Sequence, residues 1–256
     1  MQDLLSDPYF YAAAVPAVIL VGLSKGGLGG AMALIGVPLI ALVVSPVQAA
    51  AIMLPILIVM DIVSVWTWRG VWDGVTLRNV LPGAMLGIAL GWATAALVTP
   101  GAVRLIVGMI ALVFVLRWLA QRFVRGERPG RHSVVRGTLC GALAGFTSFV
   151  AHAGGPPYQV YALPLRQPPA LYVGTSVIFF AVVNAVKLVP YFALGQFSAT
   201  NLAASAILMP VAPLATLAGA WLVRRMKADV FYPLMYGMVA LVSLKLIHDG
   251  IVELWM

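Results

Sequence analysis

Two glycine-rich runs interrupt apolar stretches of the sequence. The first is Ser24-Lys25-Gly26-Gly27-Leu28-Gly29-Gly30, and the second is His152-Ala153-Gly154-Gly155-Pro156-Pro157. A helix that restarts after such a break carries unsatisfied N–H groups and about half a positive charge at its first turn. Inside a membrane these groups need a partner, and an anion is one such partner. The runs therefore predict an anion site, with close glycine packing between helices as the alternative.

The candidate site residues fall into two sets. Backbone N–H donors are expected from Gly27, Leu28, Gly29, Gly30, Gly154 and Gly155. In the second run, Pro156-Pro157 suit a first helical turn, where no N–H donor is needed. Candidate substrate contacts from side chains are Ser24, Lys25, Ser148, His152, Tyr158, Gln159, Asn184 and Lys187.

Three charged residues and one histidine suggest chemistry within the membrane. A buried lysine costs several kcal/mol unless it is paired or wet, so Lys25 either contacts substrate or reaches an aqueous vestibule or a carboxylate. Lys187 either contacts the substrate pathway or extends to the membrane surface. Asp61 is the only carboxylate inside a predicted span, and it either couples transport to protons or holds one of the lysines. His152 is a second proton-coupling candidate, with a structural hydrogen-bonded histidine as the alternative.

The composition shows which elements must position these residues. The chain has 256 residues, of which 62% are hydrophobic and only 9% are charged. A typical soluble domain is about 25% charged, so we expect an all-α polytopic membrane protein. The single cysteine, Cys140, excludes an intrachain disulfide and a zinc cluster, and we expect no metal or cofactor.

About 20 apolar residues are needed for one crossing. Six segments meet this length, at Val47–Trp68, Asn79–Val98, Val103–Ala120, Ala170–Phe192, Thr200–Val223 and Val230–Ile251. The regions Phe10–Val44 and Val134–Leu165 contain the two glycine-rich runs. We interpret each as a broken helical hairpin with its tip inside the membrane.

The basic residues predict the orientation, because cytoplasmic loops are enriched in lysine and arginine. With the loop Gln121–Val135 inside, twelve of the sixteen basic residues lie on the cytoplasmic side: Arg69, Arg78, Arg117, Arg122, Arg125, Arg128, Arg131, Arg136, Arg166, Arg224, Arg225 and Lys227. Both termini are then periplasmic.

The two halves of the chain resemble each other at an offset of roughly 123 to 129 residues. Asp61 aligns with Asn184, Leu81-Pro82 with Met209-Pro210, and Gly91 with Gly219. Residues 1–128 and 129–256 each hold a broken hairpin and three spans, so the second repeat is inverted in the membrane. Inverted repeats with broken helices are typical of secondary transporters.

The glycine-rich motifs also carry a family resemblance. Gly22–Gly30, running on to Val37-Pro38-Leu39, resembles the first motif of the TauE/SafE sulfite exporter family. Gly141–Gly145, followed by Gly154-Gly155-Pro156-Pro157 and Tyr161-Ala162-Leu163, resembles its second motif. The resemblance implies export of sulfite, organosulfonates or related sulfur anions across the bacterial inner membrane. At the first break, many members have Ser-Gly followed by a longer glycine run, whereas this sequence has Lys25.

Several alternatives stay open. The chain could carry another small anion, act as a proton-coupled importer, or be a membrane assembly protein without a substrate. An enzyme is disfavoured, because Ser148 and His152 lie on one segment and no His-Glu-x-x-His motif occurs. We expect a small sulfur-containing anion and membrane lipids as partners, and no nucleic acid. A homodimer is also left open.

Overall fold

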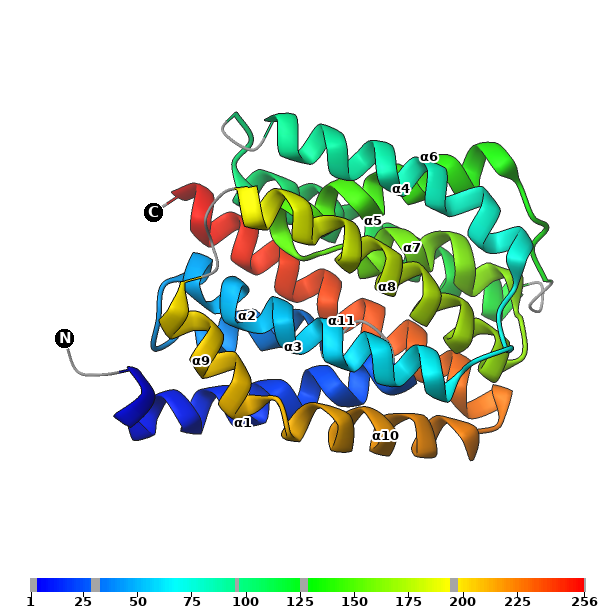
Figure 1. The fold of residues 1–256 in the computed structure, drawn as a ribbon. Coiled ribbons are helices and arrows are strands. Elements are labelled where there is room, and N and C mark those ends of the chain that lie inside the picture. Colours follow the sequence, from blue (N-terminus) through cyan, green and yellow to red (C-terminus); the bar gives the residue numbers. More distant parts are fainter. Residues whose placement is uncertain (1–3, 29–32, 95–96, 125–128, 194–197, 256) are drawn as a thin grey trace. The chain divides into compact units, whose positions relative to one another are not determined.

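The computed structural model describes residues 4–28, 33–94, 97–124, 129–193 and 198–255. All regular structure in these ranges is helical, without strands, which confirms the predicted all-α class. In chain order the helices are η1 (Leu4–Ser6), α1 (Pro8–Leu23), the π-helical turn η2 (Ser24–Leu28), α2 (Ala33–Ile40), α3 (Pro46–Thr67), α4 (Gly74–Thr94), α5 (Pro100–Val124), α6 (Val134–Ala151), α7 (Gly155–Ala162), η3 (Leu163–Leu165), α8 (Pro169–Ala193), α9 (Ala199–Leu208), α10 (Val211–Arg224) and α11 (Ala228–Trp255) (Figure 1).

The described chain has seven helices that are long and apolar enough to cross a membrane, or eight if one bent pair counts as a span. The predicted polytopic architecture is therefore confirmed. Local signals explain where several helices begin. The side chains of Asp7, Ser45, Ser133 and Ser198 each accept a hydrogen bond from a backbone N–H in the following helical turn. These are the preferred residue types for capping a helix start.

One predicted span is wrong as a continuous helix. The segment Thr200–Val223 is divided into α9 and α10, which are bent by 47° at Met209-Pro210. Pro210 has no N–H to donate and its ring crowds the preceding turn, which favours a bend at this position.

Both glycine-rich runs interrupt helices, as predicted. The first piece of each hairpin, Pro8–Leu28 or Val134–Ala151, is long and apolar enough to cross a membrane. The second pieces, α2 and α7, have eight residues each and rise about 12 Å. They are too short to cross a hydrocarbon core of about 30 Å.

The chain forms two compact units. Unit 1 contains Met1–Trp72 and Ser176–Met226, and unit 2 contains Asp73–Thr175 and Lys227–Met256. Each unit combines elements from both predicted repeats. In unit 1, α1 of the first half packs along α10 of the second half (Figure 1). In unit 2, α6 of the second half packs along α4 of the first half.

Glycines allow these helix pairs to approach closely. In unit 1, a Cβ atom added to Gly26 would lie 2.2 Å from the carbonyl oxygen of Thr216. In unit 2, a Cβ atom added to Gly141 would lie 2.0 Å from the carbonyl oxygen of Val80. The close-packing role therefore holds for these two glycines.

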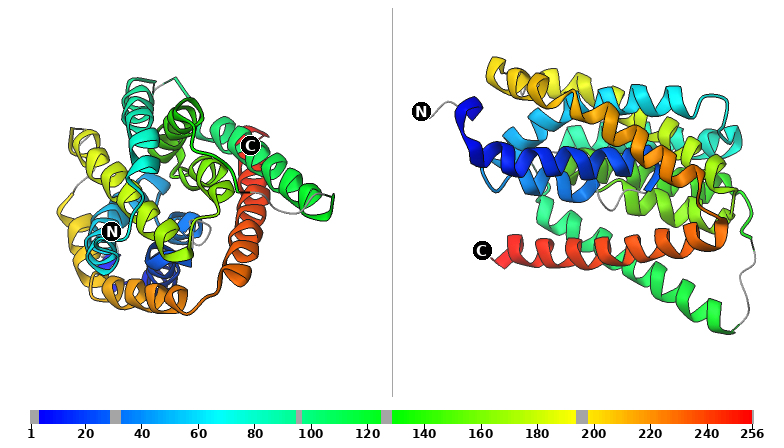
Figure 2. Two further views of the ribbon diagram at one scale, coloured as in Figure 1. Left: turned by 90° about the vertical axis from the view of Figure 1, so that its right-hand side faces the viewer. Right: turned by 90° about the horizontal axis from the view of Figure 1, so that it is seen from below.

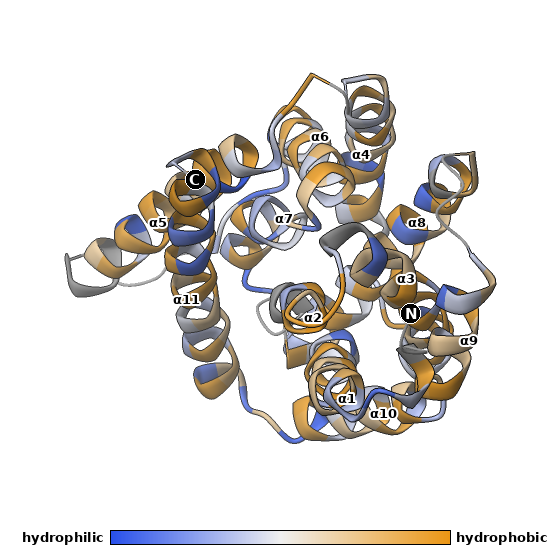
Figure 3. Ribbon diagram, turned by 90° about the vertical axis from the view of Figure 1, so that its left-hand side faces the viewer, coloured by the Kyte–Doolittle hydropathy of each residue, from blue (hydrophilic) through white to orange (hydrophobic). Residues whose placement is uncertain are grey.

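The outer surfaces of the helices suit lipid. In unit 1, Figure 3 shows α1 and α10 coloured mainly as hydrophobic, and Leu214 and Trp221 of α10 are exposed. In unit 2, α5 and α11 contact each other (Figure 2), with the rings of Trp118 and Tyr236 stacked at 4.0 Å between centroids. Exposed apolar side chains are expected where helices face hydrocarbon.

Candidate functional site

Four polar side chains gather in the interior of unit 1, and we call Lys25, Asp61, Asn184 and Lys187 the lysine–aspartate cluster. The Nζ atom of Lys25 lies 2.6 Å from Oδ1 of Asp61. The amide nitrogen of Asn184 donates to Oδ2 of the same carboxylate, also at 2.6 Å. Lys187 is 1% exposed and interacts electrostatically with both Lys25 and Asp61. The cluster therefore joins the first glycine-rich break to α3 and α8.

The broken turn η2 presents Lys25 to the cluster. Gly27 has φ 141°, which side-chain-bearing residues rarely adopt, and this glycine ends the helical run. The carbonyl groups just before it bond to side chains of α3 and its C-cap: Ser64 Oγ donates to Lys25 O at 3.0 Å, and Trp68 Nε1 donates to Gly26 O at 3.1 Å. These bonds fix the backbone of the break beside Asp61.

Helical spacing explains why the other members of the cluster meet. Asp61 and Ser64 of α3 and Trp68, the residue that caps its C-terminus, are separated by three and then four residues, so they lie on one helix face. On α8, the same reasoning places Phe180, Asn184 and Lys187 on one face. The Phe180 ring centroid is 5.6 Å from Lys25 Nζ, within the range of a cation–π contact.

The composition of the cluster gives an excess of positive charge when all of its ionisable groups are charged. It contains two ammonium groups and one carboxylate, so with all three ionised it carries one net positive charge. Electrostatic attraction is stronger in a low-dielectric interior than in water. A small anion is the ligand that would neutralise this excess.

The structure bears on the alternatives that the sequence left open for Asp61 and Lys187. Asp61 pairs with Lys25, as one of the two readings of this carboxylate proposed, while a role in proton coupling stays a prediction. Extension of Lys187 to the membrane surface is wrong, because its side chain is fully buried. The reason is its place on the face of α8 that carries Asn184 toward Asp61.

The second break lies in unit 2 and has a different construction. His152 has φ 52° and ends α6, with its backbone N–H donating to the carbonyl oxygen of Thr147. The chain restarts at Gly155, and Pro156 and Pro157 have no N–H groups. The backbone donors that remain at this helix start are those of Gly154 and Gly155, in agreement with the residues named from the sequence.

The other candidates are placed as follows. Ser24, Gly27 and Leu28 are buried in η2, with Ser24 before the non-helical Gly27 and Leu28 directly after it. Gly29 and Gly30 lie outside the described residues. Ser148, Tyr158 and Gln159 are buried in unit 2, and His152 is half-buried there. The use of these residues by a substrate stays a prediction.

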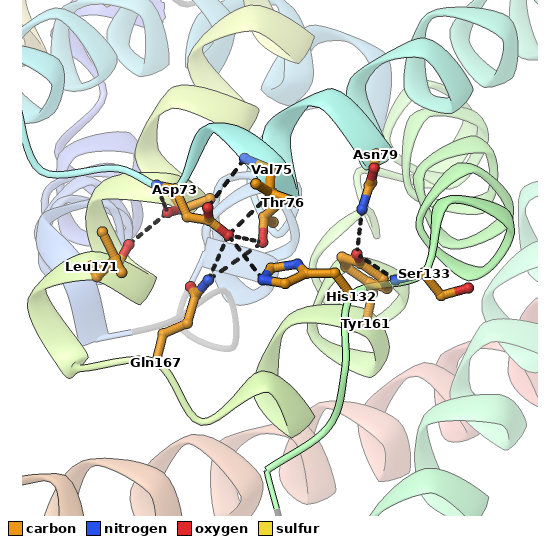
Figure 4. Close-up of polar contacts among 10 residues, drawn as sticks. Asp73, Val75, Thr76, Asn79, His132, Ser133, Tyr161, Gln167 and Leu171 are labelled. Carbon is orange, nitrogen blue, oxygen red and sulfur yellow. Dashed lines mark hydrogen bonds and ion pairs between the residues drawn. The ribbon is translucent and has the colours of Figure 1, made fainter.

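The sequence reasoning missed a polar network in unit 2 that centres on Asp73 (Figure 4). This residue precedes α4 and accepts hydrogen bonds from the N–H groups of Val75 and Thr76, the hydroxyl of Thr76 and the amide of Gln167. The Nε2 atom of His132 lies 3.6 Å from its Oδ2. An aspartate three residues before Thr76 is a helix-start signal that could have indicated the position.

These contacts determine the ionisation of Asp73, which lies in a loop between helices. Burial by itself raises the pKa of the carboxyl, but hydrogen bonds from the hydroxyl and N–H of Thr76, the N–H of Val75 and the amide of Gln167 outweigh it. The pKa of Asp73 is therefore lowered from its ordinary value. Hydrogen bonds to the charged form favour ionisation in this way.

The network also bears on the predicted orientation. Asp73, His132 and Gln167 belong to three segments that the charge pattern places on the cytoplasmic side. Tyr232, near the predicted cytoplasmic end of the span Val230–Ile251, donates to the carbonyl oxygen of Gln167 at 2.5 Å. At the predicted periplasmic end of the same unit, Arg104 pairs with Glu253. The groupings agree with the charge pattern.

In the described ranges, no group of three or more His, Cys, Asp or Glu side chains is placed to hold a metal ion.

Comparison with known proteins identifies the family. The model of the family described as "Sulfite exporter TauE/SafE" matches residues 14–246, which include both glycine-rich runs and every member of the lysine–aspartate cluster. No curated protein and no solved structure gives a match. The family suggested by the two glycine-rich motifs is confirmed: the chain belongs to the TauE/SafE sulfite exporter family.

Proposed function

We propose that this protein is a secondary transporter that exports sulfite or a small organosulfonate across the bacterial inner membrane. Membership in the family supports an exporter-type transporter of anions. The observation that carries the proposal within this chain is the lysine–aspartate cluster, in which Lys25 pairs with Asp61 and the buried Lys187 interacts electrostatically with both.

The chemistry of the cluster favours a compact oxyanion. Lysine ammonium groups are point charges with three donors, and they can each donate to an oxygen of a sulfite or sulfonate group. A bound anion offsets the cost of placing the second ammonium group in the interior. A zwitterion such as taurine adds no net negative charge and is the poorer substrate.

Membrane energetics favour the outward direction. One charge crossing the membrane is worth about 2.3 kcal/mol per 100 mV, and a cell interior that is negative expels anions. Export therefore needs no coupling ion. Alternating access around a site at broken helices is how many transporters with inverted repeats work. We propose that Gly154 and Gly155 add backbone donors to the substrate at the second break.

Reconstitution tests the proposal. Purified protein in liposomes would be supplied with labelled sulfite, sulfoacetate, taurine, sulfate or thiosulfate, and flux measured under an imposed membrane potential. We expect flux of sulfite or sulfoacetate above taurine. Lys187→Met should lower that flux at least tenfold, because the excess positive charge is lost.

Lys245→Met provides the matched control. Lys245 is also a helical lysine, but it pairs with Asp249 in the same helix, four residues away. This variant should transport like the wild type. Absence of flux for every anion, or equal flux in wild type and Lys187→Met, would refute the proposed function.

A further inference from the structure

We propose that Asp61 is an internal counter-ion for Lys25 that the substrate anion replaces, so that the empty transporter keeps Lys25 neutralised. This inference rests on the proposed anion transport and adds a mechanism to it. In this mechanism Lys25 binds the substrate anion, and Asn184 keeps its hydrogen bond to the Asp61 carboxylate that the anion displaces.

The two oxygens of Asp61 have separate partners. Lys25 contacts Oδ1 and Asn184 donates to Oδ2, each at 2.6 Å. When Lys25 moves away from Oδ1, the bond from Asn184 to Oδ2 can stay in place. In its charged form, Lys187 is attracted to Asp61 and then supplies the compensating positive charge. The carboxylate is therefore not left uncompensated when its first partner leaves.

Lys25 is the member of the pair that can move. Ser64 donates a hydrogen bond to the carbonyl oxygen of Lys25, and Trp68 donates one to that of Gly26. Neither bond involves the side chain of Lys25. The side chain of Lys25 is 12% exposed, against 5% for Asp61. Its four-carbon stem has several rotatable bonds, and the face of Phe180 lies close enough to attract the ammonium group.

The repeat supports a position near the membrane midplane. Asp61 and Asn184 are counterparts in the predicted repeat, 123 residues apart, and they hydrogen-bond directly to each other. The helices that carry them begin at Pro46 and Pro169, with the same separation. Counterparts in an inverted repeat that touch lie on the pseudo-twofold axis in the membrane plane. An unpaired lysine costs most at that depth.

Charge counting shows why the counter-ion matters. With Lys25, Lys187 and Asp61 ionised, the empty cluster has a charge of +1, and binding of a monoanion brings it to zero. Without the carboxylate, the loaded cluster has a charge of +1 and the empty cluster +2. The loaded variant thus carries the same charge as the empty wild type, whereas the empty variant carries a larger charge through the membrane.

The test separates exchange from net efflux. Liposomes containing Asp61→Asn protein would be loaded with labelled sulfite, and release would be measured with and without unlabelled sulfite outside. Net efflux requires the transporter to return empty, but exchange does not. We expect net efflux to fall at least tenfold and exchange to fall no more than threefold. Asp61→Glu should restore net efflux.

Asp249→Asn is the matched control, because it removes an aspartate that pairs with a lysine outside the cluster. It should leave both modes unchanged. Asn184→Ala provides a second test that keeps the charge. It removes the hydrogen bond to the displaced carboxylate, so sulfite should bind roughly tenfold more weakly in a thermal-shift titration. Because the charge of the cluster is unchanged, net efflux should not fall more than exchange does.

The outcomes are distinct. If folded Asp61→Asn loses exchange and net efflux equally, or keeps both, the counter-ion role is wrong. If Asp61→Asn does not fold, unchanged sulfite affinity in Asn184→Ala overturns the proposal instead. If the wild type itself carries no anion, the proposed function fails and the counter-ion role falls with it.

Discussion

Charged residues of the same type in this protein differ in their burial and in the partners that they contact. Lys187 and Lys245 are both lysines in apolar helices, but the first is buried beside Lys25 and Asp61 and the second pairs with Asp249 in its own helix. Asp73 is a further case, since its carboxylate connects the start of α4 to Gln167. Its charge therefore contributes to stability.

Asp73→Asn should lower the free energy of unfolding at pH 7 by about 1–2 kcal/mol, because charge-assisted hydrogen bonds are lost. The pKa of Asp73 is lowered in the folded state. Its contribution is therefore present above the unfolded pKa of about 3.9 and is lost as the pH falls through the folded pKa. The apparent melting temperature in detergent, measured from pH 7 to pH 3, should depend less on pH in this variant.

Asp249→Asn is again the comparison, since it removes a carboxylate outside this network. Parallel melting curves for wild type and Asp73→Asn over the acid range would show that the Asp73 network does not contribute to stability.

At the scale of elements, backbone contact between helices depends on glycine. Gly26 lies where the broken turn η2 meets α10, and a Cβ atom there would be 2.2 Å from Thr216 O and 2.6 Å from the backbone nitrogen of Ala220. Both neighbours are backbone atoms and cannot rotate away. The position of Lys25, the preceding residue, depends on this contact because η2 is held between α3 and α10.

Gly26→Ala should lower stability by about 1–3 kcal/mol or more, as expected when a side chain is forced into a close-packed site. Gly237→Ala in α11 is the matched control, because a Cβ atom at Gly237 meets nothing within 4 Å. Alanine there should be neutral or stabilise the helix by up to about 1 kcal/mol. Equal melting temperatures for the two variants would contradict the importance of the contact between η2 and α10.

At the scale of the whole molecule, the charge pattern predicts both termini in the periplasm. The contacts of Asp73 join segments that this pattern places on one side, and which side is cytoplasmic stays a prediction. A C-terminal alkaline phosphatase fusion should therefore be active and a green fluorescent protein fusion dark. A fusion at Gln121, in the predicted cytoplasmic loop, should give the opposite pair of signals. The reverse pattern of signals would show that the predicted orientation, with both termini in the periplasm, is wrong.

Local properties of the chain were sufficient to predict most of the helices. Apolar length and proline and glycine positions depend only on nearby residues, so α3, α5 and α8 and both breaks were predictable. The two glycine-rich motifs likewise indicated the family. The bend between α9 and α10 was missed because Pro210 was read as part of an apolar run, although a proline favours a bend in a helix.

Tertiary structure alone decided how the charged residues combine. The sequence singled out Lys25, Asp61, Asn184 and Lys187, but it left open whether Asp61 pairs with either lysine. The partners of Asp61 lie 36 and 123 residues away along the chain. Such contacts depend on which faces of α3, η2 and α8 meet, and hydropathy in an apolar helix does not define that face. The depth of a lysine and the partner of a carboxylate are consequently properties of helix packing.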